Sequence, residues 1–142
     1  MLEIQNIDAN NLDFVKNFLL KVKSVEELDE NILKNGLMVK DDDIIGIISY
    51  EVFISYGLIR YFVFKKDTDE LIVKELIDEL SKKARNNGLT HLFSIVNNKD
   101  LENLFISFDF YKEDLKDVYI EEVSFLESEF KDANLLIKDL SI

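Results

Sequence analysis

The first quarter of the chain changes from strand-like to helix-like spacing of its apolar residues. Residues 2–7 alternate apolar and polar side chains, which predicts a half-buried strand. Over residues 11–23 the apolar side chains recur every three or four positions, which predicts an amphipathic helix whose apolar stripe lies in the core. Ser24 and Glu27 form a capping-box pattern, and the apolar positions that follow predict a second, short helix ending at Gly36.

The next segments carry a β-type pattern. Residues 37–40 and 44–54 are rich in β-branched and aromatic side chains, and three aspartates at 41–43 separate them, which predicts a hairpin. These aspartates lack the spaced acids, the glycine and the distant glutamate of a calcium loop, so we interpret them as a solvated turn. Residues 58–64 predict a further strand, which makes three antiparallel strands in sequence.

The second half begins with the strongest helical pattern. Residues 69–87 predict a long helix that stops at Gly88, a residue able to adopt the left-handed conformation. A strand over residues 89–96 follows, and a helix of that length suits a parallel crossover. A short helix over 100–108 and a last strand around 135–137 complete the predicted order.

Length and composition restrict the class of protein. The 142 residues, of which 47% are apolar, predict a single domain over residues 1–142, because linkers and internal repeats are missing from the sequence. No apolar run is long enough to cross a bilayer, and the first residues do not have the pattern of a secretory signal. We therefore expect a cytoplasmic protein that does not bind membranes.

Charge and missing residue types exclude several kinds of chemistry. The net charge of −12 has no basic stripe to offset it, so nucleic acid is not an expected partner. The chain has no cysteine and one histidine, which excludes thiol nucleophiles and the usual structural zinc site. No metal cofactor is expected.

Three stretches carry a resemblance to a known family. Residues 44–50, with a glycine at Gly46, resemble the third strand of the GNAT acyltransferases, and residues 58–64 resemble their fourth strand. Residues 98–110 are similar to the asparagine, short helix and following segment of that family, and residues 129–140 to its tails. The resemblance covers nearly the whole chain. It implies an α/β (α+β) fold, with a mixed central sheet of about six to seven strands flanked by about four helices.

The resemblance also implies an activity. GNAT enzymes transfer acetyl from acetyl-CoA to a primary amine, and the tail resembles those of members that acetylate small amino-acid-like molecules. In such an enzyme the strand backbone of Phe62, Val63 and Phe64 would hold the pantetheine arm of the cofactor.

The family's diphosphate loop, of the form Arg/Gln-x-x-Gly-x-Gly/Ala, is where this sequence departs from the pattern. The matching residues are Thr68, Asp69, Glu70, Leu71, Ile72 and Val73, without arginine, glutamine or glycine. Glycines let the backbone approach a phosphate, and the N-terminus of a helix attracts it. Here two carboxylates meet that helix dipole, with Thr68 as a possible N-cap. We therefore expect weak or lost binding of acetyl-CoA.

The catalytic residues of the family are equally incomplete. Many members have a tyrosine in the short helix as general acid for the CoA thiolate, and the matching residue is Phe105, which has no proton to donate. Glu51 is the remaining candidate for the general base, although strand alternation is also compatible with a solvent-facing side chain. Arg60 is a candidate for binding a substrate carboxylate, with a salt bridge as the favoured alternative. For His91, a structural role is favoured over that of a base.

Six aromatic side chains are expected to pack in the core around the strands: Tyr50, Tyr56, Tyr61, Phe62, Phe64 and Phe93.

Two functions remain open. One is an N-acetyltransferase acting on a small amine. The other is a non-catalytic GNAT-like module, a pseudoenzyme, that binds a metabolite, a peptide or a protein partner.

Overall fold

The computed structural model describes residues 2–21, 28–113, 119–120, 123–124 and 134–140. The chain divides into two compact units, Met1–Glu51 with Arg60–Leu80, and Val52–Ile59 with Ser81–Ile142. Three elements contribute residues to both units: β3 (Asp43–Phe53), β4 (Tyr56–Phe64) and α3 (Glu70–Asn86).

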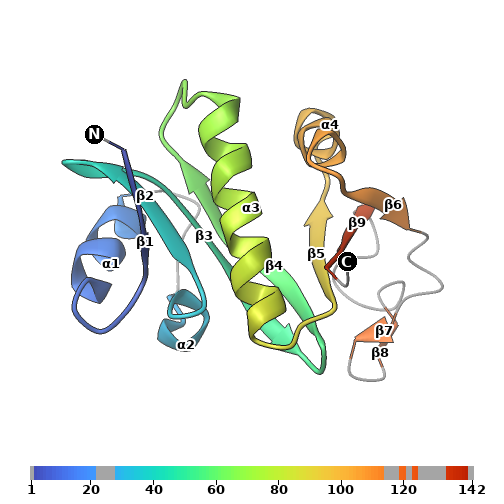
Figure 1. The fold of residues 1–142 in the computed structure, drawn as a ribbon. Helices are drawn as coiled ribbons and strands as arrows, with labels where there is room; N and C mark the ends of the chain where they lie inside the picture. Colours follow the sequence, from blue (N-terminus) through green and yellow to red (C-terminus); the bar gives the residue numbers. More distant parts are fainter. Residues whose placement is uncertain (1, 22–27, 114–118, 121–122, 125–133, 141–142) are drawn as a thin grey trace. The chain divides into compact units, whose positions relative to one another are not determined.

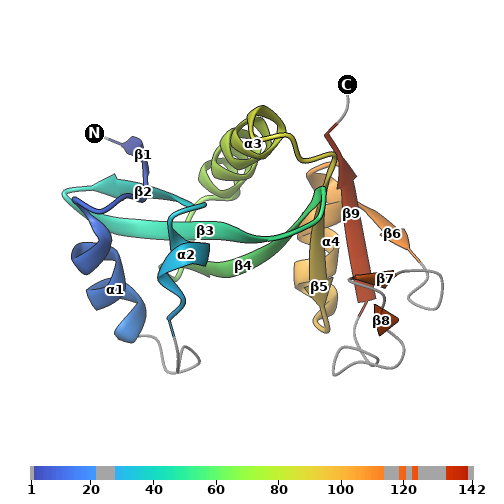
Figure 2. The same cartoon turned by 90° about the horizontal axis from the view of Figure 1, so that it is seen from below.

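The first unit is an antiparallel sheet with helices on both faces. Besides its parts of β3, β4 and α3, it contains β1 (Glu3–Asn6), α1 (Leu12–Leu20), α2 (Glu30–Leu33) and β2 (Leu37–Asp41). Strand β2 pairs antiparallel with both β1 and β3, which confirms the predicted hairpin. Helices α1 and α2 cover one face of these strands, and α3 covers the other (Figures 1 and 2).

The core of the first unit follows the predicted apolar stripes. Val15 and Leu19 of α1 are fully buried and pack with Leu33, Met38 and Ile47. On α3 the residues Val73, Leu76, Ile77 and Leu80 are buried, as their helical spacing predicts.

Two glycines are explained by close approach of other groups. A Cβ on Gly46 of β3 would lie 2.1 Å from the ring of Phe64, so the aromatic ring occupies the space above the glycine. A Cβ on Gly36 would lie 2.7 Å from the Ile48 carbonyl oxygen. The prediction of Gly36 as a helix cap is wrong, because α2 ends at Leu33 with Lys34 as its C-cap.

The start of α2 also differs from the prediction. The helix begins at Glu30, and its N-cap is Asp29, whose side chain accepts hydrogen bonds from the backbone N–H groups of Asn31 and Ile32. Ser24 and Glu27, the predicted capping box, lie outside the described residues.

The second unit is built around a parallel crossover and a terminal strand. It contains β5 (His91–Val96), α4 (Lys99–Ser107), β6 (Tyr111–Glu113), β7 (Tyr119–Ile120), β8 (Val123–Ser124) and β9 (Asn134–Asp139). Strand β5 runs parallel to β4, with Gly57 opposite Leu92, and antiparallel to β9. The predicted crossover and last strand are therefore confirmed, whereas the sequence pattern did not indicate β6, which pairs with β9.

Hydrogen bonding joins the strands in the order β1-β2-β3-β4-β5-β9-β6, and β7 and β8 form a separate pair. A mixed seven-stranded sheet with four helices among the described residues confirms the α/β fold class expected from the sequence. Within the same residues, none of the helices combines the length and the apolar character needed to span a membrane.

Candidate functional site

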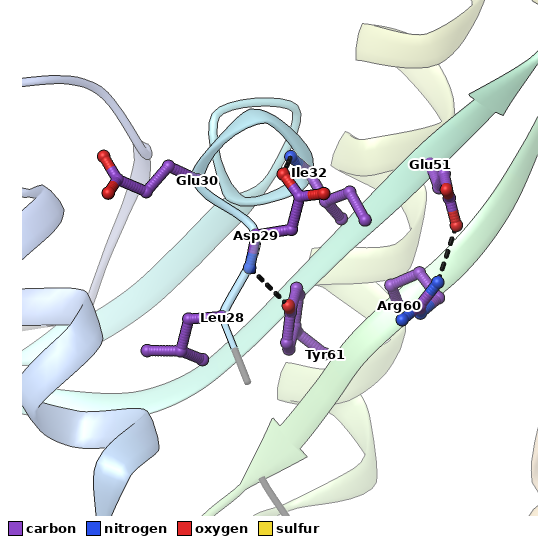
Figure 3. A pocket seen from close by; sticks show the side chains of 7 residues that line it. All are labelled: Leu28, Asp29, Glu30, Ile32, Glu51, Arg60 and Tyr61. Atoms are coloured by element: carbon purple, nitrogen blue, oxygen red, sulfur yellow. Dashed lines mark hydrogen bonds and ion pairs between the residues drawn. The ribbon is translucent and has the colours of Figure 1, made fainter. Parts of the chain in front are cut away.

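A pocket of about 540 Å³ opens in the first unit (Figure 3). Its walls come from the segment that leads into α2, from α2 itself, and from neighbouring positions of β3 and β4; they are Leu28, Asp29, Glu30, Ile32, Glu51, Arg60 and Tyr61. The volume falls within the range of small-molecule sites. Two candidates from the sequence, Glu51 and Arg60, are thus brought together here.

Tyr61 is the residue that gives the pocket its shape. Its φ of 52° is in the left-handed region, although it lies inside strand β4. Successive side chains of a regular strand point to opposite faces, but this local break allows Arg60 and Tyr61 to line one pocket. A bulky residue in this conformation costs about 1–2 kcal/mol, and such strain gathers at functional sites.

The Tyr61 hydroxyl connects β4 to the segment preceding α2. The backbone N–H of Asp29 donates a hydrogen bond of 2.8 Å to the phenolic oxygen. Because the Asp29 side chain caps α2, this hydrogen bond also fixes where the helix starts relative to β4. The sequence placed Tyr61 in the aromatic interior and did not indicate either contact.

Glu51 and Arg60 form an ion pair with 2.6 Å between Oε1 and Nη1. Figure 3 shows the two side chains pointing toward each other from neighbouring strands. Both are partly solvated, with 33% of the Glu51 side chain and 42% of the Arg60 side chain exposed. The favoured salt bridge of Arg60 is present, and its partner is the general-base candidate.

The two other acidic residues of the pocket, Glu30 and Asp29, also have partners within the protein. Glu30 pairs with Lys16 of α1 at 3.3 Å, and Asp29 caps its helix. The lining thus has three carboxylates and one guanidinium, which gives it negative formal charge. Leu28 and Ile32 add apolar surface. Such a mixture suits a small organic cation or zwitterion better than an anion.

The N-terminus of α3 is closed by its own N-cap. The Asp69 carboxylate accepts a hydrogen bond of 2.9 Å from the backbone N–H of Leu71, and the Asp69 carbonyl accepts from Ile72. The suggestion of Thr68 as N-cap is wrong, because its hydroxyl donates to the Lys65 carbonyl instead.

Of the other residues in this loop, Glu70 and Leu71 are exposed, Ile72 is half-buried and Val73 is buried. Phe62, Val63 and Phe64 form the end of β4, where the rings of Phe62 and Phe64 meet edge to face with centroids 5.1 Å apart. Phe64 covers Gly46 as described above.

The candidates in the second unit have structural surroundings. Phe105 of α4 is 1% exposed and packs edge to face against Phe110. The Nδ1 atom of His91 lies 2.8 Å from the Thr90 hydroxyl, and its ring meets the edge of Tyr56. Phe93, which stacks on Tyr56, is buried as expected.

Glu102 of α4 was not a candidate from the sequence, yet its side chain is only 5% exposed. It lies 3.7 Å from Lys99 and 3.6 Å from Lys112, and accepts a hydrogen bond from Asn134 of β9. Because several of the residues near it in the sequence are polar, the sequence did not indicate that Glu102 is buried. Within the described residues, no three acidic or histidine side chains gather closely enough to hold a metal ion.

Comparisons with known proteins give matches in structure and none in sequence. No family model matches the chain, and no curated protein does. Among solved structures, N-acetylglutamate synthase from Neisseria gonorrhoeae, in complex with coenzyme A and N-acetyl-glutamate, has a TM-score of 0.73 at 15% identity. The match covers 100% of this chain and 36% of that one, so the chain spans about a third of the synthase.

Two further structures match over nearly their whole length. A probable acetyltransferase from Staphylococcus epidermidis has a TM-score of 0.71 at 17% identity, with 98% of this chain and 99% of that one covered. An acetyltransferase of the GNAT family from Staphylococcus aureus has a TM-score of 0.69 at 13% identity, with coverage of 99% and 100%. At these identities the likeness establishes the fold, and the fold of this chain is that of the GNAT acetyltransferases.

Proposed function

We propose that this chain is a GNAT-fold binding protein that takes a small molecule with a primary amine into the pocket around Glu51 and Arg60, and that it binds acetyl-CoA weakly or not at all. The carboxylate-rich lining supports the amine as ligand. The contact between Asp69 and Leu71 carries the second half of the proposal, since it places a fixed negative charge at the tip of α3.

The energetic argument concerns a phosphate that approaches this tip. A carboxylate about 6 Å from a phosphate charge costs about 3 kcal/mol at an effective dielectric constant of about 20, before screening by salt. That cost corresponds to about a hundredfold loss of affinity. In addition, the N–H of Leu71 already has an acceptor. Charge and hydrogen bonding therefore both oppose a diphosphate.

Thermal unfolding with millimolar acetyl-CoA tests the proposal. Ligand at about 100 times its Kd adds about 2.7 kcal/mol of apparent stability, so binding would raise Tm by several degrees. We expect no rise for the wild type. Asp69→Gly removes the charge and frees the Leu71 N–H, whereas Asp69→Asn removes only the charge and keeps a good N-cap. Both should respond more than the wild type, and Asp69→Gly the most.

Glu75→Gln is the matched control, because it removes one charge from an exposed position six residues after Asp69, nearly two turns further along α3. It should leave the response to acetyl-CoA unchanged. A clear rise in Tm for the wild type would overturn the proposal, and equal responses of all variants would refute the role given to Asp69.

The second candidate function is an active N-acetyltransferase. What favours it is that solved structures of this fold contain coenzyme A, among them the two N-acetylglutamate synthase complexes. The same titration separates the two functions, because an active enzyme must bind the cofactor. Acetyl transfer to an amine, followed as free thiol released from acetyl-CoA, would then establish the second.

A further inference from the structure

We propose that the pocket recognises free α-amino acids, with Arg60 binding the carboxylate and Glu51 the ammonium group. The inference rests on the proposed function only in assigning an amine to this pocket, and it makes no use of the state of the cofactor site. It concerns two partly solvated side chains on neighbouring strands, Glu51 of β3 and Arg60 of β4.

The spacing of the two charges matches that of the ligand. Glu51 Oε1 and Arg60 Nη1 are 2.6 Å apart. In an α-amino acid the nitrogen and the carboxyl carbon are about 2.5 Å apart, because both are bonded to the same carbon atom. An α-amino acid placed head to tail against the pair sets each of its charges opposite the unlike charge of the protein. A molecule whose charges are several carbons apart meets both only when its chain folds back on itself, which costs conformational entropy.

The pair has hydrogen-bonding capacity left for a ligand. The contact uses one guanidinium nitrogen and one carboxylate oxygen, whereas arginine offers further N–H donors and a carboxylate a second oxygen. A planar guanidinium binds a carboxylate through two parallel hydrogen bonds. The ligand can therefore add to the pair without first breaking it.

An independent observation supports a binding role for this part of β4. Tyr61 adopts the left-handed conformation next to Arg60, and the hydrogen bond from Asp29 holds its ring in place. The Arg60 guanidinium carbon lies 6.0 Å from the centre of that ring, which limits the directions the guanidinium can take. Strained backbone conformations cluster at ligand-binding and active sites, which supports a ligand-binding role for the neighbouring Arg60.

The rest of the lining determines which amino acids fit. Leu28 and Ile32 supply apolar contact, and Asp29 and Glu30 add negative charge. An acidic side chain on the ligand would be repelled, whereas an aliphatic or basic one would not. We therefore expect leucine and lysine to bind more tightly than glutamate.

Isothermal titration of the full chain tests the proposal with L-leucine and two blocked forms. Leucinamide lacks the carboxylate and N-acetyl-leucine lacks the ammonium group. Each should bind at least about tenfold more weakly than leucine, because each leaves one charge of the pair without its partner. The ω-amino acid δ-aminovalerate, which has both groups but separates them, should also bind more weakly.

Variants assign the two roles. Arg60→Gln should remove the preference for leucine over leucinamide, and Glu51→Gln the preference for leucine over N-acetyl-leucine. Arg60→Lys keeps the charge without the planar fork, so it should retain part of the first preference. Lys74→Gln is the matched control, since Lys74 is in a comparably exposed ion pair with Asp78 on α3.

The outcomes separate this inference from the proposed function. Equal binding of leucine and leucinamide, or unchanged preferences in both pocket variants, would overturn the inference while leaving an amine-binding pocket. Absence of any heat from leucine would overturn it as well. A wild type that binds acetyl-CoA refutes the proposed function alone, and the preferences for amino acids would still be expected.

Discussion

The phenolic oxygen of Tyr61 accepts a hydrogen bond of 2.8 Å from the backbone N–H of Asp29, although the two residues lie 32 positions apart in the sequence. One residue belongs to strand β4 and the other caps helix α2. The contact therefore holds two walls of the pocket together, and the backbone of Tyr61 is in the left-handed region.

Tyr61→Phe should lower stability by about 1 kcal/mol, because a backbone donor loses its partner while the ring remains. This corresponds to a decrease in Tm of about 4 °C in thermal unfolding. Tyr56→Phe is the matched control, since Tyr56 contacts Phe93 and His91 through its ring, which this substitution keeps. A decrease of the same size in the control would contradict the importance of the Tyr61 hydrogen bond.

Ile54 offers a stabilising substitution. It is 79% exposed and has φ 56°, a conformation that β-branched residues rarely adopt. Ile54→Asn or Ile54→Gly should raise the free energy of unfolding by about 1 kcal/mol, since strain is relieved and little burial is lost. Val52→Asn, at a neighbouring exposed strand position, should not stabilise. A lower Tm for both Ile54 variants would show that the apolar side chain itself is needed there.

Gly46→Ala should destabilise the first unit by about 1–3 kcal/mol, because the added methyl group would overlap the Phe64 ring. The cost should decrease in a Phe64→Ala background, where the ring is missing. Urea unfolding of the two single variants and the double variant gives this coupling energy. Strictly additive effects of the two substitutions would mean that the Phe64 ring is not the reason that position 46 requires glycine.

Glu102→Ala should lower the free energy of unfolding by about 2 kcal/mol. The substitution removes a buried carboxylate that accepts a hydrogen bond from Asn134 and pairs with Lys99 and Lys112. Lys99→Gln should cost less than about 0.5 kcal/mol, because that lysine side chain is 77% exposed. Denaturant unfolding of both variants compares the two. Similar losses would indicate that the ion pair with Lys99 matters more than the burial of the carboxylate.

Asp69→Ala should lower stability by about 1 kcal/mol through loss of the N-cap of α3, whereas Asp69→Asn should have little effect. Thermal unfolding without ligand measures both. Thr68→Ala is the control for the neighbouring hydroxyl, which bonds outside the helix. If Asp69→Ala leaves Tm unchanged, the carboxylate is not the cap in solution.

The amino-acid sequence alone predicts the order of most helices and strands and many of the buried apolar positions. Helix α3 was predicted over residues 69–87 and is found at Glu70–Asn86, with Gly88 beyond it at φ 88°. Such features depend on the spacing of apolar residues and on local turn chemistry, which can be read along the chain. The loop residues before α3 were also informative, since their charge and lack of glycine are local properties.

The pocket, in contrast, could not be predicted from the sequence, because it depends on contacts between distant segments. Strand alternation assigns Arg60 and Tyr61 to opposite faces, and nothing local predicts a tyrosine in the left-handed region. That conformation is unfavourable in isolation, so it persists only where distant contacts fix it, such as the hydrogen bond from Asp29. The burial of Glu102 and the position of Phe64 on Gly46 likewise depend on elements that meet only after folding.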